Sequence, residues 1–156
     1  MVYSAAEEVA HKEEKYHSLY MDIAYRVAEM SHAKRRKVGC VIVKDERIIS
    51  MGWNGMPNGM ANSCEDYDTL RGISTTKKEV LHAEANALMK LAKYGSSSNG
   101  ATLYTTTSPC FECAKLVYQS GIKKLVYSEF YTDQQPLTFL YTTPGFNIIQ
   151  LEKNID

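Results

Sequence analysis

Hydrophobic and polar positions recur with two different periods along the chain, which predicts both helices and strands. Between Glu13 and Ala33, apolar residues are spaced three and four apart, as on one face of a helix. These positions are Tyr20, Ile23, Ala24, Val27 and Met30. Residues 38–43 and 47–53 are short runs rich in β-branched side chains, and the polar residues 44–46 between them predict a hairpin.

The second half of the chain continues this alternation. Residues 81–93 have helical spacing, and the stretch 95–100, rich in glycine and serine, ends that helix. Further on we expect a strand at 101–107, a helix from Cys110 to Ser120 with Gly121 at its C-terminal cap, a strand at 122–127, a short helix near 137–141 and a strand at 146–151. Strands that alternate with helices imply an α/β domain in which helices cover both faces of a mixed sheet. We expect residues 1–156 to form this single domain, because the sequence has no internal repeat.

Between these elements, residues 54–80 show no convincing periodicity and are expected to form a loop. A loop of this length is uncommon in a compact domain unless it has a function. The segment is therefore a candidate for a functional role.

Composition excludes whole classes of protein. The chain has 156 residues, of which 44% are hydrophobic and 23% charged, as in an ordinary soluble globular protein. No apolar run approaches the ~20 residues that a membrane-spanning helix needs. Residues 1–15 are acidic and polar and lack the apolar centre of a signal peptide. We expect a cytoplasmic protein that does not enter membranes, and in a reducing compartment four cysteines indicate metal binding or catalysis before disulfides.

Charge bears on the choice of ligand. Lysine and arginine together number 18, as do aspartate and glutamate, so the formal net charge is +0. Proteins that coat long nucleic acids need a surplus of basic charge. The balance argues weakly against a nucleic-acid polymer as partner, whereas a small anionic ligand needs only a local basic patch.

Four residues carry the side chains of a catalytic zinc site: His82, Glu84, Cys110 and Cys113. Zinc favours imidazole and thiolate ligands in a tetrahedron, and a catalytic site keeps its fourth position for water. Cys110 and Cys113 are three positions apart, so in the first turn of a helix both sulfurs point the same way. Pro109 suits that helix start, where backbone N–H groups favour thiolates. His82 is the expected third ligand, and Glu84 is placed to reach a water on the metal.

The order H-x-E followed by P-C-x-x-C is the signature of zinc-dependent base deaminases, in which the glutamate carries protons and does not bind the metal. Each half alone is weak, since a single C-x-x-C also occurs in redox pairs and structural zinc sites. The alternative is a closed zinc site with Cys40 or Cys64 as fourth ligand, which leaves Glu84 without a role. For Cys40, inside an apolar strand, a buried small hydrophobe is the favoured interpretation.

These motifs resemble the cytidine deaminase superfamily, which implies a three-layer α/β/α fold with a central five-stranded sheet. The segment 52-GWNGMPNGMANSCE-65 resembles the G-Y-N-G-x-P-x-G stretch of deoxycytidylate (dCMP) deaminases, with Trp53 in place of the tyrosine. The resemblance extends through 36-RKVGCVIV-43, 82-HAEANAL-88, 108-SPCFECAKLVYQSGIKKLVYS-128 and the Tyr131-Thr132-Asp133 that follows. It does not cover residues 1–15.

The resemblance implies the reaction dCMP plus water to dUMP plus ammonia, a supply step for thymidylate synthesis. Zn²⁺ would activate the water and Glu84 would move the protons. Asn54 matches an asparagine that holds the sugar and base, and Ala83 falls within the substrate-binding motif. Tyr131 matches a tyrosine that closes over the base and crowds a substituent at C5. Core packing is the alternative role for Tyr131.

The basic run 34-KRRK-37 precedes the first expected strand, where the resemblance implies a loop that borders the active site. We hypothesise that one or two of Lys34, Arg35 and Arg36 bind the 5′-phosphate of dCMP, since arginine recognises phosphate in a bidentate manner. A solvated basic turn is the alternative.

Regulation is also implied by the resemblance. Such enzymes are commonly hexamers that dCTP activates and dTTP inhibits, with Mg²⁺ on the triphosphate. The residues that match the effector site are Gly52, Trp53, Asn54, Gly55, Pro57, Asn58 and Gly59. Glycines there let backbone N–H groups approach an anion closely. Alternatively, these glycines only shape a turn.

Two other functions compete with this prediction. A polynucleotide deaminase that acts on tRNA or single-stranded DNA shares the metal motif, but it needs a basic stripe or aromatic platforms for the flanking nucleotides. A non-catalytic, zinc-stabilised binding module would have no use for Glu84.

Overall fold

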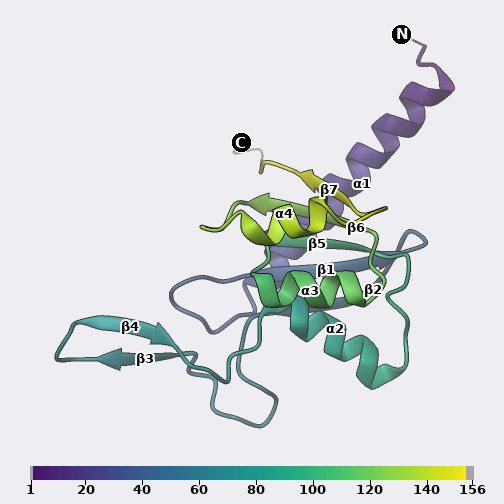
Figure 1. Ribbon diagram of the computed structural model, residues 1–156. Helices are drawn as coiled ribbons and strands as arrows, with labels where there is room; N and C mark the ends of the chain where they lie inside the picture. The colour runs from purple at the N-terminus through teal and green to yellow at the C-terminus, as the bar shows by residue number, and fades with distance from the viewer. Residues whose placement is uncertain (1, 154–156) are drawn as a thin grey trace.

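A computed structural model describes residues 2–153, and its centre is a five-stranded sheet (Figure 1). The strands lie in the order β2-β1-β5-β6-β7. Their bounds are Gly39–Lys44 for β1, Arg47–Trp53 for β2, Thr102–Thr107 for β5, Lys124–Glu129 for β6 and Asn147–Gln150 for β7. Strand β1 is antiparallel to both β2 and β5, whereas β6 is parallel to both β5 and β7. The prediction of a mixed five-stranded sheet is confirmed.

Helices cover both faces of the sheet, because strand residues alternate between two cores. Helix α1 (Ala5–Ala28) lies on one face, and α2 (Ala83–Tyr94), α3 (Phe111–Gln119) and α4 (Gln135–Tyr141) lie on the other (Figure 1). The strand side chains that face α1 are Val41, Val43, Tyr104 and Val126. Those that face the other three helices include Cys40, Ile42, Leu103 and Leu125. The expected three-layer α/β/α architecture is confirmed, as is the burial of Cys40 in an apolar core.

Helix α1 differs from the prediction at both ends. It begins at Ala5 and not at Glu13, because Ser4 and Glu7 form a capping box that satisfies backbone N–H groups at the helix start. The first turns are exposed, and their apolar residues (Ala5, Ala6, Val9 and Ala10) are mostly small, so they mark the helix only weakly in the sequence; these turns extend beyond the sheet in Figure 1. The helix ends at Ala28, so the predicted end at Ala33 is wrong. Of the polar segment 1–15, Met1 lies outside the described residues.

The prediction that residues 54–80 form a loop is also wrong in part, since this segment contains a two-stranded hairpin. Strands β3 (Glu65–Asp68) and β4 (Ile73–Thr76) pair antiparallel and project from the body of the protein (Figure 1). Leu70 at the tip is 97% exposed. Because most of the hairpin is exposed on both faces, its sequence lacks the alternation by which a half-buried strand is predicted.

A close approach between β2 and α2 fixes the position of the first turn of α2. Gly52 is buried, and a Cβ atom there would collide with the carbonyl oxygen of Ala83 and lie 2.6 Å from the backbone nitrogen of Ala87. Only glycine lets the two backbones pack so closely. The physical role of Gly52 visible in the fold is therefore packing, and it places the start of α2 against the sheet.

The remaining boundaries agree with the sequence prediction to within a few residues, including Gly121 after the end of α3, with a φ of 85°. Within residues 2–153, no helix combines the length and the apolar character that crossing a bilayer requires.

Candidate active site

The predicted metal ligands lie at the N-terminal ends of two helices. His82 is the N-cap residue of α2, and Cys110 is the N-cap residue of α3, which follows β5 after Ser108 and Pro109. The sulfur of Cys110 accepts a hydrogen bond of 3.5 Å from the backbone N–H of Cys113. Exposed N–H groups and the helix dipole at these ends favour negative charge, and they therefore favour cysteine as thiolate.

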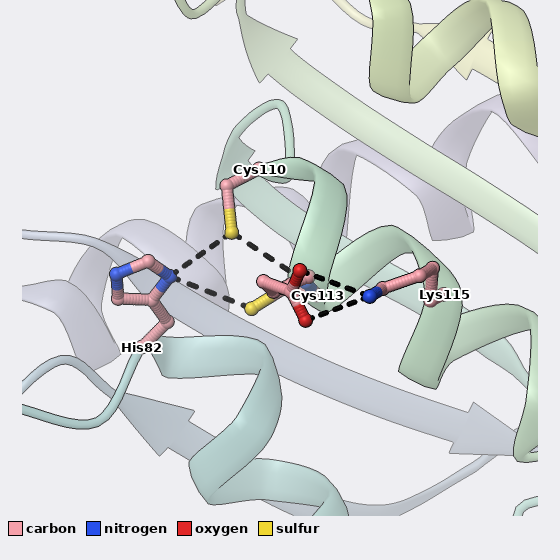
Figure 2. A network of polar contacts seen from close by, with 5 residues as sticks. His82, Cys110, Cys113 and Lys115 are labelled. Atoms are coloured by element: carbon pink, nitrogen blue, oxygen red, sulfur yellow. Dashed lines mark hydrogen bonds and ion pairs between the residues drawn. The ribbon is translucent and has the colours of Figure 1, made fainter.

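The imidazole of His82 and the sulfurs of Cys110 and Cys113 point toward one another (Figure 2). Nδ1 of His82 lies 3.3 Å from Sγ of Cys110 and 3.5 Å from Sγ of Cys113. In a tetrahedral zinc site, a nitrogen at ~2.1 Å and a sulfur at ~2.3 Å from the metal are about 3.5 Å apart. The donor set and its spacing therefore fit Zn²⁺. Neither Cys40 nor Cys64 belongs to this group in the described part of the chain, so a closed four-ligand site finds no support.

The pKa shifts of the three candidate ligands do not all have the same sign. A hydrogen bond between the two thiols lowers the pKa of Cys110, and the hydrogen bond with His82 acts in the same direction. The same bond between the sulfurs raises the pKa of Cys113, and burial raises it further. The hydrogen bond to Cys110 raises the pKa of His82. The lowered pKa of Cys110 favours the thiolate that metal ligation requires, whereas Cys113 and His82 hold their protons more tightly and would have to release them when a metal binds.

Glu84 lies beside this cluster without belonging to it. Only 4% of its surface is exposed, and burial raises the pKa of its carboxyl group. The Thr105 hydroxyl lies 3.3 Å from Oε1 of Glu84 and 2.9 Å from the carbonyl oxygen of Thr107, and it can donate to either. A raised pKa makes the carboxylate of Glu84 a stronger base than an exposed glutamate, which favours its taking a proton from water in general acid–base catalysis.

A cavity of about 350 Å³ opens onto this cluster. This volume is ordinary for a small-molecule site. Eight of the residues predicted from the sequence line it: Arg35, Arg36, Asn54, His82, Ala83, Glu84, Cys110 and Tyr131. Lys34 does not line it, and of the stretch Gly52–Gly59 only Asn54 does. Cys113 is buried and is not among the lining residues. The fold therefore gathers two of the three predicted metal ligands, the acid–base candidate and two arginines around one space.

The side-chain amide of Asn54 forms two hydrogen bonds with the protein backbone. Its Oδ1 accepts a hydrogen bond of 2.8 Å from the N–H of Val38, and its Nδ2 donates one of 2.8 Å to the carbonyl oxygen of Arg36. The amide still has one N–H and one lone pair for a ligand. Asn54 therefore holds the loop that precedes β1 while it lines the cavity.

Tyr131 is 42% exposed and lines the cavity, so it is not a core residue. Its backbone N–H donates a 2.7 Å hydrogen bond to the hydroxyl of Ser108, two residues before the metal ligand Cys110. The guanidinium group of Arg36 lies over its ring. Tyr131 thus contacts both the segment 108–110, which leads to the metal ligand Cys110, and the loop with the basic run 34–37.

The Gly52–Gly59 stretch is tied to the start of α2. The N–H of Gly55 donates to the carbonyl oxygen of Leu81 at 3.0 Å, and the N–H of Leu81 donates to the carbonyl oxygen of Gly55 at 2.9 Å. Asn86 donates from its side chain to the carbonyl oxygen of Trp53 at 2.7 Å. A change in this stretch therefore reaches the residue next to His82 through the backbone.

Sequence reasoning missed two residues at the site. Glu65 lines the cavity from the base of the hairpin, and Thr105 lies behind Glu84. Glu65 is the last residue of the segment 52–65 that carries the resemblance, but it lies outside the G-x-N-G-x-P-x-G part, so the motif assigns it no role. Thr105 belongs to no motif, and both residues reach the site through contacts that join distant parts of the chain.

A mixed five-stranded sheet between helix layers, with a histidine and two cysteines at two helix starts and a buried glutamate beside them, defines a zinc-dependent deaminase of nucleobases or related rings. Residues 14–129 match the family described as "Cytidine and deoxycytidylate deaminase zinc-binding region", and the chain belongs to this family.

Relatives and solved structures agree with this assignment. Deoxycytidylate deaminase of Enterobacteria phage T2 is 38% identical in an alignment of 156 positions, gaps included, and the match covers 76% of this chain and 82% of the phage protein. ComE operon protein 2 of Bacillus subtilis (strain 168) is 33% identical over 137 residues, which cover 88% of this chain and 71% of that protein. The crystal structure of dCMP deaminase from cyanophage S-TIM5 in complex with dCMP and dUMP is similar with a TM-score of 0.76 and 34% identity, and the match covers 96% of this chain and 100% of that chain.

Proposed function

We propose that this chain catalyses the hydrolytic deamination of dCMP to dUMP and ammonia. The observation that carries the proposal is the buried carboxyl group of Glu84 beside the His82, Cys110 and Cys113 cluster, in a cavity that two arginines also line. The names of the phage relatives support dCMP as the substrate. The dUMP produced would feed thymidylate synthesis.

The metal site supplies the first part of the chemistry. His82, Cys110 and Cys113 would hold Zn²⁺, which provides Lewis-acid activation of a water molecule. Three protein ligands leave a fourth position in the tetrahedron, as in other catalytic zinc sites.

Glu84 would move the protons. It takes a proton from the water whose oxygen bonds to C4 and delivers that proton to N3 of the cytosine ring. It then takes the remaining proton of this water from the C4 hydroxyl and delivers it to the amino group, which leaves C4 as ammonia. Its burial raises the pKa of the carboxyl group, so it can hold a proton between these steps. The hydroxyl of Thr105 supports its orientation.

Three residues would recognise the nucleoside. Asn54 has free hydrogen-bonding capacity for the sugar and base, and Ala83 lies in the cavity wall next to Glu84. The ring of Tyr131 would lie over the base and crowd a substituent at C5. This predicts a preference for cytosine over 5-methylated pyrimidines.

The phosphate would bind Arg35 and Arg36, which line the cavity and can make bidentate contacts with phosphate oxygens. Lys34 is the third candidate, but it lies outside the cavity wall, and its role would be limited to long-range attraction.

We further propose that the enzyme is a hexamer regulated by dCTP as activator and dTTP as inhibitor, with Mg²⁺ on the triphosphate. The support is the resemblance of the stretch Gly52–Gly59, including Pro57 and Asn58, together with its hydrogen bonds to Leu81 and Asn86. An effector that moves this stretch would move the start of α2 and thereby His82. Sigmoidal dCMP saturation that dCTP makes hyperbolic is expected, and indifference to both triphosphates would contradict it.

Residues 1–156 would act as one catalytic domain, because the two hydrophobic cores share a single sheet. A cytoplasmic location is proposed from the four free cysteines, since two of them must stay reduced to bind zinc.

The test is release of ammonia from the purified, zinc-loaded protein with dCMP, deoxycytidine or a single-stranded oligonucleotide. The proposal predicts a preference for dCMP. Activity on the oligonucleotide alone would indicate a polynucleotide deaminase, and no release from any of the three would indicate a binding module.

A further inference from the structure

Two side chains from different elements hold the loop between α1 and β1, which carries the basic run 34–37. Asn54, after β2, bonds to the backbone of Arg36 and Val38 in the second half of the loop. Glu65, the first residue of β3, bonds to the backbone of Lys34 and Arg35, where the basic run begins. The hairpin is therefore connected directly to the proposed phosphate-binding residues.

The contact of Glu65 is specific. One carboxylate oxygen, Oε1, accepts hydrogen bonds from two consecutive backbone N–H groups, at 2.8 Å from Lys34 and 3.2 Å from Arg35. Hydrogen bonds to a charged acceptor are about twice as strong as neutral ones. The bonds fix the backbone from which the side chains of Arg35 and Arg36 extend into the cavity wall.

The base of the hairpin, at Cys64 and Glu65, is held by burial and by backbone hydrogen bonds, so it can position the loop between α1 and β1. Cys64 is 1% exposed, and its carbonyl oxygen accepts a 2.9 Å hydrogen bond from the N–H of Lys77. Glu65 pairs with Thr76 across the hairpin, and both line the cavity together with Cys64. Glu65 therefore extends from a fixed backbone, although the tip of the hairpin is exposed.

A carboxylate in the wall of a cavity for an anionic substrate would by itself repel that substrate. Within residues 2–153, Glu65 forms no ion pair with Lys34, Arg35 or Arg36, so it does not occupy their charged groups. Its hydrogen bonds go to the backbone. This arrangement leaves both guanidinium groups available for a ligand.

We propose that Glu65 is a positioning residue that holds Arg35 and Arg36 for recognition of the 5′-phosphate and so contributes to the choice of a nucleoside monophosphate over a nucleoside. The inference rests on the proposed function, since it deepens the assignment of dCMP as substrate.

The kinetic test compares Glu65→Ala and Glu65→Gln with wild type on dCMP and deoxycytidine. In Glu65→Ala, loss of two hydrogen bonds to a charged group should raise KM for dCMP about tenfold, with kcat and the turnover of deoxycytidine little changed. Glu65→Gln keeps an acceptor oxygen and should restore most of the loss. Asp66→Ala is the matched control, because Asp66 is the next residue of β3 and its ion pair is with Lys77, away from the basic loop.

The sign of the change in KM for dCMP distinguishes a positioning role of Glu65 from electrostatic repulsion of the phosphate. If Glu65 acted only by repelling the phosphate, both Glu65→Ala and Glu65→Gln would lower KM for dCMP, which would overturn the proposal. An equal loss on dCMP and deoxycytidine would overturn it as well, since that would indicate general damage to the site.

A second measurement does not depend on activity. Amide hydrogen exchange of the segment with Lys34 and Arg35 should be faster in Glu65→Ala than in wild type and close to wild type in Asp66→Ala. Unchanged exchange in Glu65→Ala would overturn the proposal. If wild type fails to deaminate dCMP, the proposed function is wrong, whereas the exchange experiment still decides whether Glu65 positions the loop.

Discussion

The guanidinium group of Arg36 lies 5.1 Å from the centre of the Tyr131 ring, a cation–π contact that joins the loop before β1 to the loop after β6. Both residues line the cavity that contains Glu84. The residue proposed to bind the phosphate is thus in contact with the residue proposed to cover the base. A ligand that moved Arg36 would change the contacts of the Tyr131 ring.

Removing the Tyr131 ring should relax the choice of base. In Tyr131→Ala, kcat/KM for dCMP should fall about tenfold or more, because the aromatic face over the base is lost. The rate on 5-methyl-dCMP relative to dCMP should rise. Tyr131→Phe keeps the ring and should behave like wild type in this ratio, and an unchanged ratio in Tyr131→Ala would remove the proposed role of the ring.

Arg35→Ala and Arg36→Ala should each reduce the discrimination between dCMP and deoxycytidine by about tenfold to a hundredfold, since a charged hydrogen bond to phosphate contributes about 1.5–3 kcal/mol. Lys37→Ala is the control, because Lys37 belongs to the same basic run, is exposed and does not line the cavity. Discrimination that survives in both arginine variants would place phosphate recognition elsewhere.

Thr105→Val should lower kcat about tenfold with little change in KM, because the buried carboxyl group of Glu84 loses a hydroxyl partner. Thr105→Ser retains the hydroxyl and should recover most of the activity. Thr106→Val is a matched control on the same strand, since the Thr106 hydroxyl accepts a hydrogen bond from the N–H of Gly39 and makes no bond to Glu84. Equal loss of kcat in Thr105→Val and Thr106→Val would indicate a general effect of strand packing.

Gly52→Ala should destabilise the fold by about 1–3 kcal/mol, because the added methyl group must push α2 away from β2. Chemical denaturation gives this free energy of unfolding. The control is Gly55→Ala in the same stretch, where the nearest atom to an added Cβ is Cδ1 of Trp53 at 3.9 Å. Equal stability of Gly52→Ala and wild type would contradict the role assigned to Gly52 in packing.

The sequence predicted what local patterns encode. His82, Glu84, Cys110 and Cys113 fall in two short motifs at helix starts, so their convergence follows once the helices are placed on one sheet. The order of the central elements follows from apolar periodicity, because each of them buries one face. Periodicity is a signal of burial, and where burial is absent the prediction fails.

The missed features are those that depend on exposed segments or on distant contacts. The first turns of α1 are exposed and begin at the capping box of Ser4 and Glu7, a local S-x-x-E pattern that the large apolar positions do not report. Strands β3 and β4 are exposed on most of their surface, so no apolar period marks them. Glu65 reaches Lys34 across 31 positions of the chain, a contact that no local pattern encodes.

The most direct test of the central claim is the rate of ammonia release from dCMP by Glu84→Gln compared with wild type, with the zinc content of both proteins matched. If Glu84 carries the protons beside a metal held by His82, Cys110 and Cys113, the variant should keep its zinc and lose activity by about a hundredfold to ten-thousandfold. A zinc-loaded Glu84→Gln protein that releases ammonia at the wild-type rate would contradict the account.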